Sequence, residues 1–182
     1  FPHKYDVNHR YKNEGNGVFQ ATHSCATLPN ANEMSWYVMY GDPRWDGDEV
    51  WTTMGHLYKG GMWFKKKSVL QAEGHYDTEK SADGSTDMRI IANKRYKNTN
   101  SSINSSGTPS ASDVNNYFYL PALGEYYDDQ LQDAGIAGYY WSSSASVYFG
   151  EQSAYALVFQ SGSVMVGDPA RVFGYRTNPS FE

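Results

Sequence analysis

The sequence contains a single cysteine, Cys25, among its 182 residues. One thiol excludes an internal disulfide and a four-cysteine zinc site, and it leaves the redox compartment undecided. The chain also has no apolar run near the roughly 18 residues that would span a bilayer. Its opening residues, Phe-Pro-His-Lys, lack the charged-then-apolar pattern of a leader. We therefore expect a soluble chain, or the soluble part of one, whose stability comes from packing.

Positive charge is also scarce. Fifteen Lys and Arg against twenty Asp and Glu give a net charge of -5. This balance opposes binding to a phosphate backbone or to an anionic bilayer, so nucleic acid and membrane insertion are excluded as expected partners. The basic run Lys65-Lys66-Lys67 is short, and in an acidic protein it is typical of a solvated face.

Metal and catalytic motifs are missing as well. The five histidines show no His-Glu-x-x-His spacing, and none lies in the C-terminal third. His56 with a neighbouring acid is more typical of a solvated pair than of a general base. The acids Asp42, Asp46, Asp48 and Glu49 lack the order of an EF-hand loop and suit a helix start. We expect no metal and no cofactor.

A second acidic group consists of Glu125, Asp128, Asp129 and Asp133. A pair of carboxylates can hydrolyse a glycoside when a cleft separates them by about 5 to 9 Å. Nothing in the spacing of these four residues fixes such a distance, so the group predicts no glycosidase.

Aromatic residues are abundant, with 16 Tyr, 8 Phe and 5 Trp. That many rings can bury enough surface to offset the entropy of folding, which excludes a disordered chain. Together with Gly, Ser and Asn they form the mixture found in adaptable binding surfaces. An irregular β-rich domain with many turns would have the same composition, and both interpretations stay open at this point.

Two helices are predicted in the first third of the chain. Asn30 and Glu33 form a capping box ahead of an aromatic run that ends at Gly41, so a helix is expected over 30–40. Asp42-Pro43 repeats a start signal. Apolar residues then recur at helical spacing before Gly60-Gly61, so a second helix is expected over 44–58.

The middle of the chain has weaker patterns. Residues 62–70 indicate a strand or an exposed connection, 73–87 a loop with a turn at Asp83-Gly84, and 88–91 a short strand. Residues 97–116 are almost all small and polar, which predicts a functional loop or a mobile excursion. Residues 117–121 have the character of a core strand.

The C-terminal third alternates clearly. In 154–160 the large residues Tyr155, Leu157 and Phe159 share one face, and Ala156, Val158 and Gln160 share the other. Ser161-Gly162 is a hairpin turn. The alternation continues with Val164 and Val166 inward and Ser163, Met165 and Gly167 outward, and a third strand is expected over 171–176.

These patterns resemble a known superfamily. The evidence is Leu28-Pro29 before the capped helix, Leu120-Pro121, the run 138–144 (Gly-Tyr-Tyr-Trp-Ser-Ser-Ser), the hairpin 154–164, and Arg171 with Gly174-Tyr175-Arg176. Over roughly 25–177 the chain resembles C-type-lectin-like domains of the FISUMP type. It also resembles the formylglycine-generating enzyme branch and the variable proteins of diversity-generating retroelements.

The resemblance implies an α+β fold, in which two helices pack beside small irregular antiparallel sheets with long loops. We expect one such domain over 1–182, with an N-terminal extension 1–24 and a polar loop 97–116. The sequence departs from the family's pattern after the last strand. The ending Gly174-Tyr175-Arg176-Thr177 is followed by Asn178-Pro179-Ser180 instead of a hydrophobic finish.

In the retroelement-diversified members, a fixed framework supports ligand-contacting positions that vary. Carried over, the framework is Trp141, Ser142, Ser143, Leu157, Phe159, Gly162, Val164, Gly174 and Arg176. The ligand-binding positions are Val147, Tyr148, Phe149, Gln152, Ser153, Ala156, Val158, Gln160, Met165, Gly167, Asp168, Val172, Phe173 and Tyr175. Large apolar side chains in the turn-like segments 147–149 and 172–173 stabilise a monomer little while they are exposed. We therefore expect them either to contact a partner or to pack back onto the sheet as a small secondary core.

The sequence therefore predicts a non-enzymatic binding protein. The resemblance implies a protein or glycan receptor on a cell surface as partner, and an extracellular location on a virion tail or a bacterial surface. Some members of this class are trimeric, so a homo-oligomer stays open. The alternatives are a static adhesion, pilus or lipoprotein tip module, and a degenerate formylglycine-generating-type enzyme or carbohydrate hydrolase. With Cys25 alone, the copper-binding cysteine pair of that enzyme branch cannot form.

Overall fold

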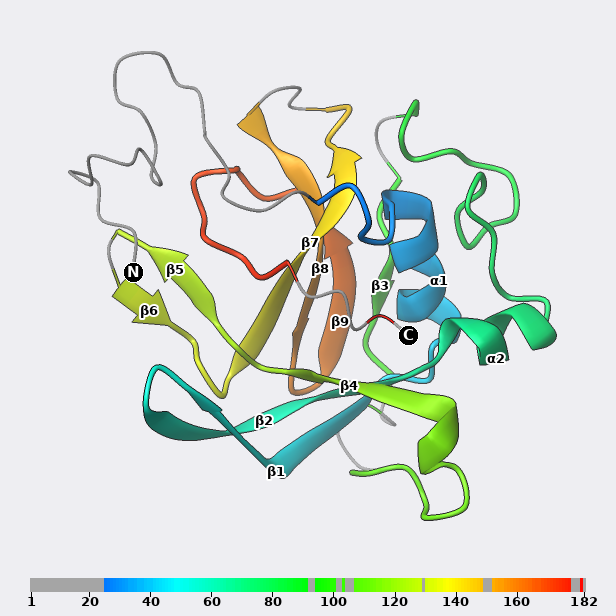
Figure 1. Cartoon of the computed structure of the whole chain (residues 1–182). Helices are drawn as coiled ribbons and strands as arrows, with labels where there is room; N and C mark the ends of the chain where they lie inside the picture. Colours follow the sequence, from blue (N-terminus) through cyan, green and yellow to red (C-terminus); the bar gives the residue numbers. More distant parts are fainter. Residues whose placement is uncertain are drawn as a thin grey trace.

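In the computed structural model, the described residues include two short α-helices, a 3-10 helix and three small antiparallel sheets (Figure 1). The structure describes residues 25–91, 94–100, 103, 107–128, 130–148, 152–177 and 181. The protein is therefore of the expected α+β class. The predicted N-terminal extension 1–24 lies outside the described residues.

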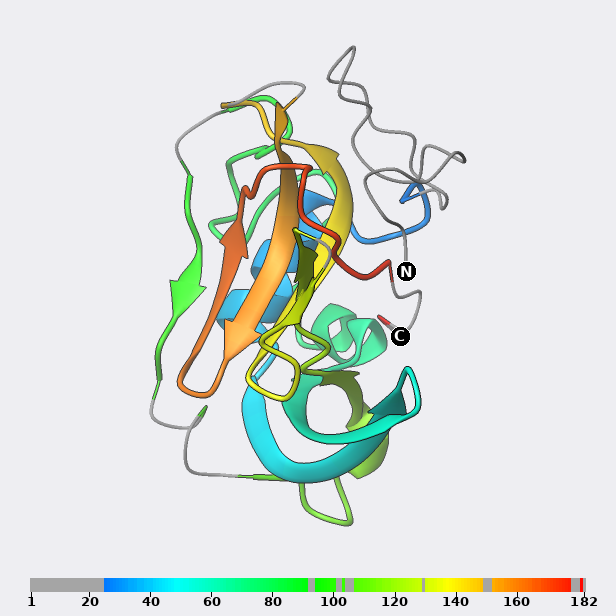
Figure 2. The ribbon, with the colours of Figure 1, turned by 90° about the vertical axis from the view of Figure 1, so that its left-hand side faces the viewer.

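The largest sheet has the strand order β3-β9-β8-β7, formed by Lys97–Asn98, Ser163–Gly167, Ala154–Gln160 and Ala137–Ala145. A second sheet, β1-β2-β4, is formed by Arg44–Thr53, His56–Lys65 and Tyr117–Pro121. A small hairpin joins β5 (Glu125–Tyr127) to β6 (Gln130–Gln132). Figure 2 shows helix α1 (Ala31–Tyr40) against one face of the four-stranded sheet, which leaves the other face turned away from the helix.

Helix α1 confirms the first predicted helix, together with its cap. The side chain of Asn30 accepts a hydrogen bond from the Glu33 amide at 3.0 Å, and the Glu33 carboxylate accepts one from the Asn30 amide at 2.8 Å. The amide of Gly41 bonds to the carbonyl of Tyr37 at the other end. The residues from Ala31 to Val38 are all buried, so the helix lies inside the molecule rather than on its surface.

Removal of this cap gives a first prediction. Asn30→Ala is expected to lower the free energy of unfolding by about 1 kcal/mol, because the Glu33 amide loses its acceptor. Urea denaturation measures the change. Asn30→Ser is the control, since it keeps an acceptor but loses the bond that the Asn30 amide donates to the carbonyl of Thr78. An equal loss in both variants would assign the stabilisation to Thr78 instead of the cap.

The second predicted helix, 44–58, is wrong. These residues form the antiparallel hairpin of β1 and β2, which turns at Met54 and Gly55 with φ of 54° and 78°. Two central residues with positive φ are the geometry of a tight hairpin turn. The apolar residues at helical spacing do not share a helix face, and Val50 and Leu57 are among the exposed ones.

Several shorter predictions are also corrected. The segment around Val69 forms helix α2 (Lys67–Ala72) rather than a strand or connection, and 88–91 is a turn closed by bonds to the Asp87 carbonyl. The loop at 73–87 and its turn at Gly84 are confirmed. The described part of 97–116 holds β3 and the 3-10 helix Val114–Asn116, and β4 confirms the core strand.

The hairpin β8–β9 and its turn at Ser161-Gly162 are confirmed. The third strand predicted at 171–176 is wrong as a regular strand. That stretch makes only isolated pairings, of Gly174 with Tyr126 and of Arg176 with Tyr140, and Ala170 just before it pairs with Ser153. A chain that turns between two partners cannot keep one ladder, which explains the irregular end.

The core lies between α1 and the inner face of the four-stranded sheet and continues to β2 and β4. Tyr140 is fully buried there; its hydroxyl donates to the Pro121 carbonyl at 2.6 Å and its ring stacks on Phe159. Phe181 packs against Tyr37 and Tyr140, so an aromatic residue beyond the polar stretch 178–180 closes the core. Cys25 is half-buried, and burial raises the pKa of its thiol, as expected for a packing residue rather than a nucleophile.

Candidate ligand-binding surface

The two faces of strand β7 differ in burial. Tyr140 points into the core, whereas the neighbouring Tyr139 and Trp141 are half-buried and lie on the opposite face. In the ladder with β8, Tyr139 lies opposite Val158 and Trp141 opposite Ala156. The face of the sheet turned away from α1, called here the outer face, is therefore lined by the alternate residues of β7, β8 and β9.

The C-terminal segment 173–176 joins β7 to β5. Gly174 exchanges both backbone hydrogen bonds with Tyr126, at 3.0 and 2.7 Å. Two residues on, the Arg176 carbonyl accepts from the Trp141 amide at 3.0 Å and the Arg176 amide donates to the Tyr139 carbonyl at 3.2 Å. In Figure 1 this red segment lies beside β7. The pairing places Tyr175 on the outer face.

Five rings from three parts of the chain meet here, and we call them the aromatic row: Tyr127, Phe173, Tyr175, Tyr139 and Trp141. Ring centroids are 5.0 Å apart between Tyr127 and Phe173, and 5.8 Å apart between Phe173 and Tyr175. The ring of Tyr175 stacks on Tyr139 at 4.9 Å and on Trp141 at 4.5 Å, both with interplanar angles of 29°. Tyr127 is 42% exposed and the other four are half-buried.

Two carboxylates lie beside phenols of the row. The hydroxyl of Tyr139 donates to Asp133 at 3.2 Å, and the Tyr175 hydroxyl lies near the Glu125 carboxylate and interacts with it electrostatically. Burial, followed by the charge of Asp133, raises the pKa of the Tyr139 phenol to about 12. Burial also raises the pKa of the Tyr175 phenol well above its usual value and that of the Glu125 carboxyl above its own. Both phenols therefore stay protonated donors at neutral pH.

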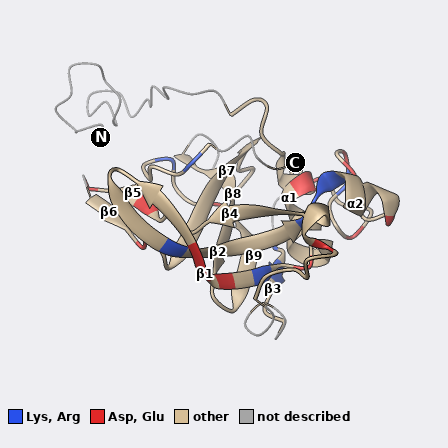
Figure 3. Cartoon of the chain, turned by 60° about the horizontal axis from the view of Figure 1, so that its bottom comes forward, with Lys and Arg blue, Asp and Glu red and all other residues tan. Residues whose placement is uncertain are grey.

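The acids sit at one edge of an uncharged surface. Strands β7, β8 and β9 contain no Lys, Arg, Asp or Glu. Figure 3 shows these strands in tan, with acidic positions on β1 and β5. Among the residues that the structure describes, neither Glu125 nor Asp133 forms an ion pair with a lysine or an arginine. The row thus carries negative charge that no basic side chain of the described chain neutralises.

The fourteen predicted ligand-binding residues are distributed unevenly. Phe149 lies outside the described residues. The exposed ones are Val147, Tyr148, Gln152 and Gln160, and the half-buried ones are Val158, Met165, Asp168, Val172, Phe173 and Tyr175. Only Phe173 and Tyr175 belong to the aromatic row.

Three of the fourteen are not available to a ligand, so the expectation is wrong for them. Ala156 has no exposed surface, Ser153 is 5% exposed, and Gly167 is buried. Ala156 is paired with Trp141 on one side and with Gly167 on the other. Ser153 pairs with Ala170 of the returning chain.

The sequence missed residues that complete the site. The resemblance places Trp141 in the framework, and the predicted ligand-binding positions include neither Tyr127 nor Tyr139. In the run Gly138-Tyr139-Tyr140-Trp141 all three side chains are aromatic, so the alternation does not identify the inward one. The framework prediction is confirmed for the buried Ser142, Leu157, Phe159 and Val164, whereas Ser143, Gly174 and Arg176 are exposed.

The predicted residues at the other end of the hairpin form a separate and shallow area. Tyr148 and Asp168 line a hollow with Lys94 and Arg95 whose volume is about 20 Å³. That space is the size of a water molecule, so it holds no ligand of its own.

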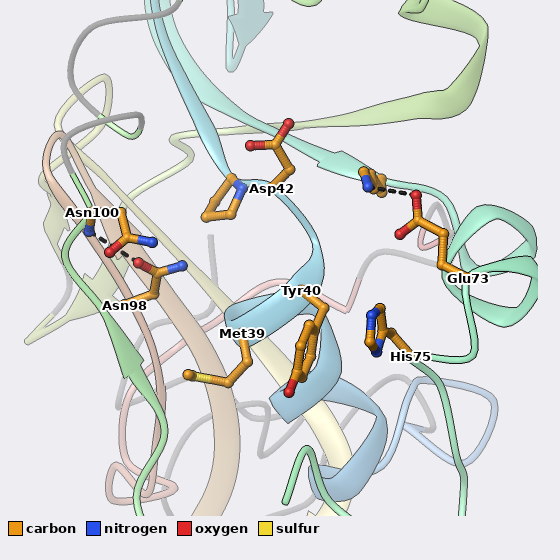
Figure 4. Close-up of a pocket in the computed structure, with 9 residues that line it drawn as sticks. Met39, Tyr40, Asp42, Glu73, His75, Asn98 and Asn100 are labelled. Carbon is orange, nitrogen blue, oxygen red and sulfur yellow. Dashed lines mark hydrogen bonds and ion pairs between the residues drawn. The ribbon is translucent and has the colours of Figure 1, made fainter.

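A larger cleft of about 320 Å³ lies at the C-terminal end of α1 (Figure 4). Its charged groups are already paired: Lys65 with Glu73 at 2.6 Å, and Asp42 with Arg44 and the Tyr117 hydroxyl. Figure 4 shows Tyr40 beside His75, and their rings stack at 4.2 Å. Because these groups satisfy one another, the cleft presents no free charge to a ligand.

Searches for other functional features gave no positive finding. Within the described ranges, no group of His, Cys, Asp or Glu is arranged to hold a metal ion. In the same part of the chain, none of the helices has the length and apolar character needed to cross a membrane. A comparison with protein-family models, curated proteins and solved structures found no match. The aromatic row is therefore the strongest candidate site on its geometry alone.

Proposed function

We propose that this chain is a non-enzymatic binding domain that attaches to a receptor through the aromatic row. The supporting observation is that stacked, half-buried rings lie on the outer face of three uncharged strands, away from the core. Rings of this kind offer large contact areas at a low entropic cost, and central aromatic residues dominate the energetics of interfaces. In keeping with the resemblance, we further propose a C-type-lectin-like domain displayed on a virion tail or a bacterial surface.

The experiment is adsorption of the fluorescently labelled protein to a panel of bacterial cells. We expect wild-type protein to adsorb to at least one strain, and Tyr175→Ala to reduce its affinity by about thirtyfold, the effect of a central hot spot of about 2 kcal/mol. Phe173→Ala should act in the same direction. Both variants should melt within a few degrees of the wild type.

The control is Tyr148→Ala, because Tyr148 is 58% exposed and lines the small hollow with Lys94 and Asp168 instead of stacking on a ring of the aromatic row. The sequence predicts that Tyr148 also contributes to binding, whereas the structure favours unchanged adsorption. Absence of adsorption to every strain, or the same adsorption for wild type and Tyr175→Ala, would contradict the proposal.

A static adhesion module is the second candidate. The contacts of Tyr139 with Asp133 and of Tyr175 with Glu125 tie the row to two acids, and such a network tolerates variation poorly. DNA context separates the two: a nearby reverse transcriptase with a template copy differing at adenines supports diversification. Gln152, Gln160 and Met165 are not easily reached from Asn codons and fit diversification poorly.

A further inference from the structure

We propose that the aromatic row and the carboxylates of Glu125 and Asp133 form a subsite for an arginine side chain presented by a partner protein. The proposal names the partner chemistry of the surface described above, and it rests on the binding function proposed there. Its basis is the juxtaposition of stacked ring faces with two acids that lack a basic partner in the described chain.

The rings supply one half of such a subsite. Tyr175 stacks on both Tyr139 and Trp141 with the same interplanar angle of 29°, so the three rings form a tilted stack rather than an enclosing cage. A planar guanidinium can lie flat on Tyr or Trp, where the negative face of the ring attracts it. An ammonium or quaternary ammonium group is better held by rings on several sides.

The acids supply the other half. Each carboxylate has about four lone-pair positions; the phenol of Tyr139 donates to Asp133, and the phenol of Tyr175 lies near Glu125. These contacts place the carboxylates beside the rings and leave acceptor positions for the parallel N–H groups of a guanidinium. Asp133 is exposed and Glu125 half-buried, so the two acids lie at different depths.

Charge complementarity favours arginine over a neutral ligand. Burial is the main cause of the raised pKa of Glu125, and the negative charge of Asp133 adds to it, so the two acids repel each other and a shared cation would relieve the repulsion. The adjacent strands carry no charge that would compete for the cation, and the net charge of -5 attracts basic partners. A neutral sugar can stack on the rings and donate hydroxyl hydrogen bonds to the carboxylates, but it brings no positive charge to balance the two acids.

The probe is the tripeptide acetyl-Gly-Arg-Gly-amide, titrated into the whole ¹⁵N-labelled protein and followed by NMR. We expect shifts confined to the aromatic row and its strands, with a dissociation constant on the order of 1 mM for one side chain. The citrulline tripeptide has the same shape without the charge, and we expect its affinity to be lower by about tenfold or more. The lysine tripeptide should also bind more weakly, because its ammonium does not stack. Raising NaCl from about 50 mM to about 0.5 M should lower the affinity of the protein for the arginine tripeptide.

Two isosteric variants test the acids. Glu125→Gln and Asp133→Asn keep an acceptor for the phenols of Tyr175 and Tyr139, so the row should stay in place while affinity for the arginine tripeptide falls about tenfold. The matched control is Asp48→Asn, which removes the same charge from an exposed site whose carboxylate pairs with Lys59 at 3.4 Å. We expect the affinity of the Asp48→Asn variant for the arginine tripeptide to equal that of the wild type. Unchanged amide spectra elsewhere show that each variant is folded.

Several outcomes would overturn the arginine subsite. Equal affinity for the citrulline tripeptide would show that the positive charge does not contribute to binding. Higher affinity for the lysine tripeptide would show that the subsite prefers an ammonium group to a guanidinium. Salt-insensitive shifts of the same row by a neutral cello-oligosaccharide, with none from the arginine tripeptide, would assign the row to glycans. If no probe shifts the row but cell adsorption still requires Tyr175, the subsite fails and the binding function stands. If adsorption is indifferent to Tyr175, the binding function itself fails.

Discussion

Tyr140→Ala is expected to lower the free energy of unfolding by about 3 to 5 kcal/mol, the range for removal of a fully buried aromatic side chain. The ring contacts Phe159 and Phe181, and the hydroxyl satisfies the Pro121 carbonyl at 2.6 Å. Truncation would leave a cavity among these rings and remove the donor from that carbonyl. Differential scanning calorimetry should show a melting temperature lower by roughly 10 °C.

Trp141→Ala is the matched control, because Trp141 follows Tyr140 in the same strand and faces the opposite way. The resemblance places Trp141 in the fixed framework, and the structure moves this role to Tyr140. We expect Trp141→Ala to cost less than half as much stability and to weaken binding, since Trp141 is half-buried in the aromatic row. Equal melting temperatures for the two variants would contradict this assignment of the faces of β7.

Gly124→Ala is expected to lower the free energy of unfolding by about 2 to 5 kcal/mol. Gly124 has φ of 68°, a left-handed conformation that costs an alanine energy. An added Cβ would also overlap the carbonyl oxygen of Gln132 and lie 2.7 Å from the Ala134 amide, and these are backbone atoms that cannot rotate away. Relief of the overlap requires movement of the β5–β6 hairpin, which carries Glu125 and Tyr127, so ligand binding should fall as well.

Gly84→Ala separates strain from overlap. Gly84 has φ of 72°, close to that of Gly124, but an added Cβ there meets no atom within 4 Å. Chemical denaturation should therefore show a loss of only about 1 to 2 kcal/mol for Gly84→Ala, with binding unaffected. A loss for Gly124→Ala no larger than that of the control would mean that the hairpin accommodates the methyl group without moving.

The parts of the fold that could be predicted depend on local chemistry. Helix α1 follows from the cap at Asn30 and Glu33, which are three residues apart, and the hairpin β8–β9 follows from strict alternation around Ser161-Gly162. The hairpin β1–β2 could not be predicted in the same way. Its apolar residues fit a helical period equally well, and the turn residue Met54 is not one that normally adopts φ of 54°.

The site could be predicted only in part, for a different reason. The resemblance predicts both Phe173 and Tyr175, and Phe173 also lies in the turn-like segment 172–173. Their partner Glu125 lies about fifty residues earlier in the sequence, and no local pattern connects the two. The acidic group was recognised, but only tertiary pairing of Gly174 with Tyr126 brings it to the aromatic row.

The C-terminal segment with Phe173 and Tyr175 is held on both sides in the sequence, by the pairing of Ala170 with Ser153 and by the burial of Phe181. A flexible segment would lose conformational entropy each time it bound a receptor, and this loss would reduce the affinity. Here the segment is ordered during folding, so little of the contact energy of the rings is offset on binding. We therefore expect that a cut in this stretch would weaken attachment even if every contact residue remained on the molecule.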